Sequence, residues 1–341
     1  MAKIRSTRRE FDWRTYTKPV RLLTAAQESA FVDGLLSPLL EWASGRDSVR
    51  FEIRARQAAI YDRGTMLLRI RGAEAPFVGE IDANVRLPRH QRTGAERLEL
   101  WPLSSPDEVS VAVKELDSLK AVNDEQTGDL PERAWLHAFA SANDGGTDAE
   151  PAYTVAETEY QYGRRRFDFV AMRRAEGVSG PGGFTTPRLV FGQFKSHGRP
   201  LSGSSGLEAH AADFADFATA LGGAHLTAAR LELDELVRQK LRLGLLSRDI
   251  PFRHFTDDRP EYLVVFSDYD LATPALDAPL AEMHDKLVAR HFQPELLRMA
   301  RIDSGTAAPS PHPAVIEAGD VFGYREFKRI RKQLRAQSAT E

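Results

Sequence analysis

Two short apolar runs that carry polar residues limit what this chain can fold into more than any other feature. The first, residues 166–170, reads Arg-Phe-Asp-Phe-Val, and the second, residues 189–195, reads Leu-Val-Phe-Gly-Gln-Phe-Lys. Both have the length and apolar content of buried β-strands. Because a carboxylate or an ammonium is costly to bury alone, we expect Asp168 and Lys195 to have a partner or a metal ion. Side chains two apart on a strand share a face, so Gln193 and Lys195 should point the same way.

The composition describes a globular protein without thiol chemistry. The 341 residues are 42% hydrophobic and 28% charged, which is an ordinary balance for one decorated core or two domains. The chain contains no cysteine, which excludes disulfides, thiolate nucleophiles and cysteine-based zinc sites. The nine histidines show no metal-ligand spacing, and His137 and His210 read as packing residues of helices. No run of apolar residues approaches the roughly 20 needed to span a bilayer, and no signal peptide is evident, so we expect a cytoplasmic protein with no membrane association.

The pattern of the chain divides it into three parts. Residues 1–125 combine a helical apolar pattern over 25–42 with short alternating runs, which predicts an N-terminal α+β domain acting in sensing, specificity or oligomerisation. Residues 126–300 show the order helix, three strands, helix, strand. Residues 301–341 read as a proline-rich linker and a basic helix. The net charge of -3 does not itself indicate nucleic-acid binding, although basic residues cluster locally.

The second part resembles the PD-(D/E)XK nuclease superfamily over residues 129–290. Asp168 matches the acidic residue on the second core strand of that family, and Gln193-Phe194-Lys195 matches the (D/E)-x-K tripeptide on the third strand, 25 residues later. Glu159, ahead of the Arg-Asp segment, and Ser196, after the tripeptide, fit the same pattern. The resemblance implies an α/β fold with a restriction-endonuclease-like core, an α-β-β-β-α-β mixed sheet flanked by helices.

The tripeptide departs from the family pattern at its first residue. Gln193 offers a neutral carbonyl oxygen where the family has a carboxylate, so the site should hold Mg²⁺ less tightly. Mg²⁺ prefers oxygen ligands but accepts neutral ones. Mrr-like restriction enzymes of the superfamily are similar in using Gln-x-Lys, so the substitution does not by itself imply an inactive site.

The expected chemistry is metal-assisted phosphodiester hydrolysis. A Mg²⁺ or Mn²⁺ ion held by Asp168, the Gln193 amide oxygen and the Phe194 backbone carbonyl would polarise a phosphodiester oxygen and a water molecule. Lys195 would stabilise the charge that develops during the reaction. We expect a further carboxylate, from Glu132 or Glu159, to restore the missing charge. Residues expected to contact nucleic acid are Arg164, Arg166, Arg199 and His197.

Each of these residues also has a simpler structural explanation. Lys195 would serve equally as an edge-strand lysine or as an ion-pair partner of Asp168. A strand glutamine such as Gln193 can simply hydrogen-bond a neighbour. Glu132 occupies the third position of a helix-capping sequence that starts at Asp129, and Glu159 would pair with the adjacent arginines.

The residues and the resemblance together favour a metal-dependent nuclease, with DNA as the expected nucleic acid. A role in restriction or anti-phage defence, with a homo-oligomer or a defence-system protein as partner, is what the resemblance suggests. The alternative is a catalytically silent module that keeps the fold and binds nucleic acid or a protein partner. A third hypothesis is an adaptor protein that binds its partners through the N-terminal domain, with the nuclease-like fold as a scaffold.

Overall fold

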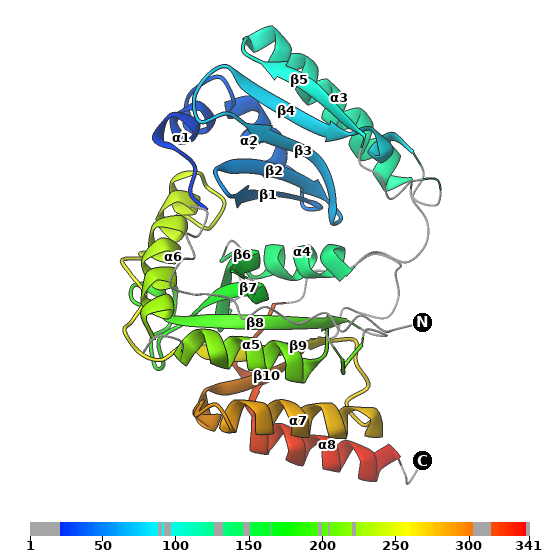
Figure 1. The fold of residues 1–341 in the computed structure, drawn as a ribbon, viewed down its shortest axis with the longest axis vertical. Helices are drawn as coiled ribbons and strands as arrows, with labels where there is room; N and C mark the ends of the chain where they lie inside the picture. The colour runs from blue at the N-terminus through cyan, green and yellow to red at the C-terminus, as the bar shows by residue number, and fades with distance from the viewer. Residues whose placement is uncertain are drawn as a thin grey trace, which may run out of the picture.

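The chain forms an α/β fold built on two β-sheets (Figure 1). The computed structural model describes residues 21–87, 91, 97–125, 132–145, 151–163, 165–196, 200–203, 205–219, 223–302 and 315–338. The helices of these ranges are α1 (Ala25–Val32), α2 (Ser37–Ser44), α3 (Pro106–Asp124), α4 (Glu132–Ala142), α5 (Leu207–Thr219), α6 (Ala224–Arg242), α7 (Asp277–Val288) and α8 (Tyr324–Ser338). The strands are β1 (Val49–Arg54), β2 (Gln57–Asp62), β3 (Thr65–Arg71), β4 (Phe77–Asp82), β5 (Leu98–Leu103), β6 (Tyr153–Tyr162), β7 (Arg165–Arg173), β8 (Arg188–Ser196), β9 (Glu261–Ser267), β10 (Leu297–Ile302) and β11 (Val321–Gly323).

The N-terminal sheet is an antiparallel meander in the order β1-β2-β3-β4-β5. Arg63 and Gly64 join β2 to β3, and both have positive φ, the conformation that a tight hairpin turn requires. The helix expected over 25–42 is two helices, because the chain turns after α1. There Leu36 N–H donates to the Ala30 carbonyl, and a side chain on Gly34 would collide with the Ala30 backbone.

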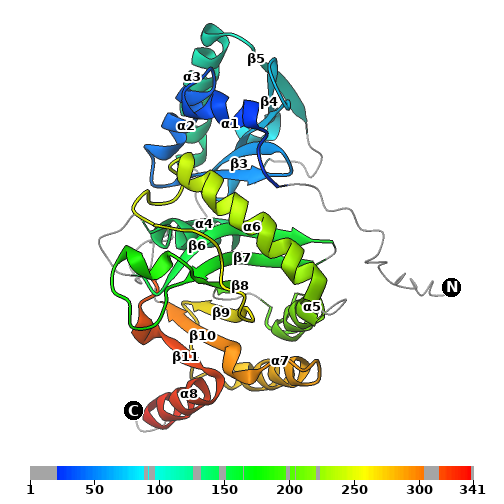
Figure 2. The same cartoon turned by 90° about the vertical axis from the view of Figure 1, so that its left-hand side faces the viewer.

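The second sheet is mixed and has the order β11-β10-β9-β8-β7-β6. β6 pairs antiparallel with β7, and β7 with β8. β8, β9 and β10 run parallel to one another, and β11 is antiparallel to β10. α4 covers one face, where Phe139 packs on Phe169 and Phe194. α5, α7 and α8 lie on the opposite face, and α6 runs beside the sheet toward the N-terminal unit (Figure 2).

α4 lies between the two sheets (Figure 1). Its Phe139 contacts the second sheet, and its His137 ring packs edge-on against Tyr61 of β2 in the first. One continuous apolar core extends from the N-terminal helices to α7 and α8. The two parts of the chain therefore share a buried boundary.

The described elements follow the expected order of helix, three strands, helix and strand, as α4, β6, β7, β8, α5 and β9, with α6 added between α5 and β9. The sequence patterns did not indicate β5, β10 or β11. The basic C-terminal helix is present as α8, while Asp129 and the expected linker over 303–313 lie outside the described residues. Among the described helices, none is both long and apolar enough to cross a membrane.

Candidate functional site

Asp168 lies where β7 and β8 separate. The last recorded pair of the two strands is Phe169 with Gly192, and Asp168 is the next residue along β7. Its Oδ2 accepts a hydrogen bond of 2.9 Å from the backbone N–H of Phe194. The Asp168 side chain thus accepts the Phe194 N–H in place of a backbone carbonyl of β7. This bond holds the Asp168 carboxylate beside the Gln193-Phe194-Lys195 segment.

Lys195 is buried on the face of the sheet that α5 covers. Its side chain has only 4% exposure, and Nζ donates to the Ser205 carbonyl at 2.8 Å, just before α5. β8 lies between β7 and β9 in the sheet, so the interpretation of Lys195 as an edge-strand lysine is wrong. The positive charge of Lys195 lowers the pKa of Asp168, as expected for neighbouring groups of opposite charge.

Gln193 is 1% exposed and points to the same face as Lys195, as the strand alternation predicts. Its Oε1 accepts the Tyr262 hydroxyl at 3.0 Å, while its Nε2 has no hydrogen-bond partner among the described residues. The oxygen and nitrogen of an amide have nearly the same shape. If the amide is turned over, Nε2 donates to Tyr262 and Oε1 occupies the position that has no donor.

The surroundings of Asp168 favour a cation. Burial raises the pKa of its carboxyl, and the negative charge of Glu159 raises it further, against the opposing effects of the Phe194 N–H, Lys195 and Arg166. A buried carboxylate beside a second carboxylate is destabilised in its charged form. A divalent cation would relieve this effect.

Glu159 lies near Asp168 but is held by arginines. Its Oε1 accepts from Arg133 Nε and Nη2 at 3.0 and 2.9 Å and also from Arg166. Its backbone has a φ of 49°, which is uncommon for a residue with a side chain. The expected pairing of Glu159 with adjacent arginines is therefore present, and this carboxylate is close enough to act on Asp168.

The other predicted residues are placed less centrally. Glu132 is the first residue of α4, the helix on the face of the sheet opposite to Gln193 and Lys195. Arg166 is largely exposed, with 57% of its side chain accessible, although it pairs with Glu159. The remaining nucleic-acid candidates, Arg164, His197 and Arg199, lie outside the described residues.

The structure adds two residues that the sequence did not assign to this site. Tyr262 of β9 bonds Gln193, and burial followed by Asp168 and Asp213 raises the pKa of its hydroxyl well above the usual value. Burial and Lys195 lower the pKa of His210 on α5, so this histidine is neutral near pH 7. It was predicted as a packing residue. The position of His210 in the first turn of α5, the helix that follows β8, could have indicated that it lies near the site.

The donor set fits a divalent ion only if neutral oxygens contribute. Within the described ranges, no group of three His, Cys, Asp or Glu residues is placed to hold a metal. Asp168, the Gln193 amide and the Phe194 carbonyl would offer one charged and two neutral oxygens, and Mg²⁺ completes such sets with water. The raised pKa of Asp168 agrees with this use, and so does the unpartnered Gln193 atom when the amide is turned over.

Comparisons with protein families, with curated proteins and with solved structures found no match to this chain.

Proposed function

We propose that this protein is a metal-dependent nuclease whose site is formed by Asp168, Gln193 and Lys195, with a restriction-endonuclease-like core. The observation that carries the proposal is the hydrogen bond from Phe194 N–H to Asp168, because it brings the acid of β7 onto the tripeptide of β8. The element order from α4 to β9 supports the same assignment. DNA is the proposed substrate, and a defence role follows from the resemblance alone.

The residues divide the chemistry between them. Asp168, Gln193 and Phe194 would hold Mg²⁺ or Mn²⁺, which supplies positive charge beside the scissile phosphate. Lys195, fixed by the Ser205 carbonyl, donates hydrogen bonds to the phosphate oxygen that gains charge. Arg166, exposed beside Glu159, binds a flanking phosphate.

The first test is cleavage of supercoiled DNA, linear DNA and single-stranded RNA by the full chain with Mg²⁺, Mn²⁺ or a chelator. We expect Asp168→Ala and Lys195→Ala each to lower the rate by about 100-fold or more, since each removes a charge that acts in the transition state. Asp249→Ala and Lys286→Ala, at exposed positions, are the matched controls. Cleavage that survives in the first pair of variants would refute the proposal.

Gln193→Glu tests the metal site without relying on cleavage. The added carboxylate should tighten Mn²⁺ binding by about tenfold, equal to ~1.4 kcal/mol, because it restores a charged ligand. The measurement is calorimetric titration of Mn²⁺ into the free protein. Gln161→Glu, on an exposed glutamine, is the control. Equal affinities for both variants and the wild type would argue against a metal at Gln193.

A second candidate is a silent module that binds nucleic acid without cutting it. The pairing of Glu159 with Arg133 and Arg166 favours this candidate, because it neutralises the carboxylate that would compensate for Gln193. If the protein is a silent module, Asp168→Ala leaves DNA binding intact with chelator present, and no cleavage occurs with any metal or any substrate. Fluorescence anisotropy with labelled DNA measures this binding and distinguishes the silent module from the nuclease.

A further inference from the structure

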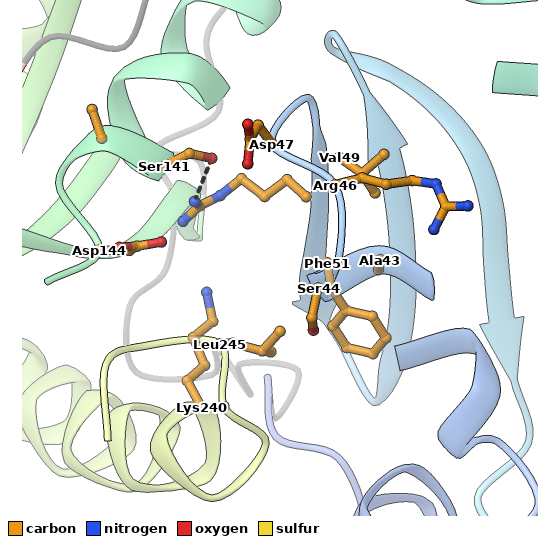
Figure 3. A pocket seen from close by; sticks show the side chains of 13 residues that line it. Ala43, Ser44, Arg46, Asp47, Val49, Phe51, Ser141, Asp144, Lys240 and Leu245 are labelled. Atoms are coloured by element: carbon orange, nitrogen blue, oxygen red, sulfur yellow. Dashed lines mark hydrogen bonds between the residues drawn. The ribbon is translucent and has the colours of Figure 1, made fainter. Parts of the chain in front are cut away.

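A pocket of about 320 Å³ opens between the two parts of the chain, and its lining includes none of the residues of the Asp168 site. Arg50 of β1, Ser141 of α4 and Lys240 of α6 all line it. Ser141, Asp144 and Lys240 approach it from one side, opposite Ser44 of α2 (Figure 3). Its size is in the range of small-ligand sites.

The pocket borders a buried cluster of ion pairs, here called the interdomain ion cluster. It joins four cationic and two anionic side chains: Arg21, Arg50, Arg54, Lys240, Glu52 and Glu157. Arg54 continues the chain of charges to Glu159, whose own partners Arg133 and Arg166 are again cationic. Within the cluster, the three arginines alone outnumber the two carboxylates, whether or not Lys240 carries its proton. Buried charge without a counter-charge is unfavourable, so the cluster favours an additional anion.

Arg50 directs unused donors into this pocket. Its side chain is 9% exposed, and Nε donates to Glu52 at 2.5 Å. Nη1 reaches Ser141 Oγ only at 3.4 Å, which is long for a hydrogen bond. Nη2 makes no hydrogen bond to the described residues. A planar guanidinium with two free donors matches the oxygens of a phosphate or carboxylate group.

Two carboxylates also line the pocket. Asp47 is exposed and Asp144 is half-buried. Carboxylates at this position accept hydrogen bonds from hydroxyl or amine groups. The Arg46 side chain points away from Ser141 and Lys240 (Figure 3) and bonds Asp117 instead.

We propose that this pocket binds a phosphate monoester of mononucleotide size, with its phosphate on Arg50 beside Lys240 and its hydroxyl or amine groups on Asp47 and Asp144. Phosphate oxygens accept from the free Arg50 donors and supply the negative charge that the interdomain ion cluster lacks. The organic part occupies the wider opening. This site is independent of the nuclease proposal, because it uses different residues.

The test is calorimetric titration of AMP and, separately, adenosine into the full chain without metal. AMP should bind at least about tenfold more tightly than adenosine, equal to ~1.4 kcal/mol or more. Arg50→Gln should abolish this difference. Ser141→Leu fills the pocket and leaves every charge of the cluster in place, so it separates ligand binding from folding. It should weaken AMP binding by about tenfold or more at an unchanged unfolding midpoint.

Arg46→Ala is the matched control, and its AMP affinity should stay within about twofold of wild type. AMP that fails to bind at millimolar concentration, or binds no better than adenosine, overturns the proposal. AMP binding that is unaffected by Ser141→Leu places the ligand elsewhere and overturns it as well. None of these outcomes depends on DNA cleavage.

Discussion

Glu52 shows how a buried charge is tolerated at the level of one residue. Its carboxylate has no exposed surface and receives Arg50 Nε, Thr158 Oγ1 and Lys240 Nζ at 2.5, 2.9 and 3.0 Å. Burial alone raises the pKa of Glu52, but Lys240, Arg50 and Arg54 outweigh it and hold the pKa well below its ordinary value. Loss of one partner from a buried pair typically costs about 3–5 kcal/mol.

Lys240 is the member of this group with the clearest pH signature. Burial, followed by repulsion from Arg50 and Arg54, lowers its pKa to about 7, against the attraction of Glu52. The unfolded lysine keeps its proton to about pH 10.5. Between these values the unfolded chain binds more protons than the folded chain, so this group makes stability rise with pH.

Lys240→Met removes this contribution. The stability of the wild type relative to Lys240→Met should increase by about 2 kcal/mol between pH 7 and pH 9. Urea unfolding at both pH values measures it, with Lys286→Met, at an exposed position, as the control. Parallel pH dependence of wild type and Lys240→Met would show that the lysine keeps its proton in the folded protein.

At the level of elements, the approach of β7 to β8 depends on a glycine. A side chain on Gly192 would overlap the ring of Phe169, its partner across the two strands. Phe169 is fully buried between α4 and the sheet, so the ring has little freedom to move. Gly192 thereby allows the close packing next to Gln193.

Gly192→Ala should therefore destabilise the fold by about 1–3 kcal/mol, the usual effect of overpacking a core. Chemical denaturation of the variant against wild type gives the value. Gly182→Ala, where a new methyl group meets only Val178 at 3.8 Å, is the comparison. A Gly192→Ala protein as stable as the Gly182→Ala protein would mean that the sheet relaxes around the methyl group.

The sequence predicted the parts of the site that lie on continuous strands. Alternation along β8 correctly placed Gln193 and Lys195 on one face, and the two apolar runs located β7 and β8. It could not predict that Tyr262 would bond Gln193, because that contact spans 69 positions and depends on the parallel pairing of β8 with β9. β10 and β11 were missed since Leu297–Ile302 alternates only weakly and Val321–Gly323 is very short.

The interdomain ion cluster was even harder to predict from the sequence. Lys240 and Glu52 are 188 positions apart, and each reads in the sequence as an ordinary surface charge of its own element. Only the packing of α6 and β1 against β6 buries them together. The predicted boundary near residue 125 stays a prediction. The two sheets lie on either side of it, and the charged contact between them was not predicted.

At the level of the whole molecule, this contact should couple the unfolding of the two sheets. Separating them would leave buried charges without partners, so we expect one cooperative transition in urea. Circular dichroism follows both sheets, and a Trp135→Phe protein limits the fluorescence of the described residues to Trp42 and Trp101 of the N-terminal part. Coincident curves are expected, while an early fluorescence change would mean that the N-terminal part unfolds independently.

The buried contact also governs how this protein can be dissected. A cut within residues 126–131 would place Glu52 and Arg54 on one fragment and Glu157 and Lys240 on the other. Each fragment would then expose charges and apolar surface that the intact chain covers. Isolated halves are consequently poor substitutes for the full chain, and point substitutions are the reliable way to assign roles to its two sheets.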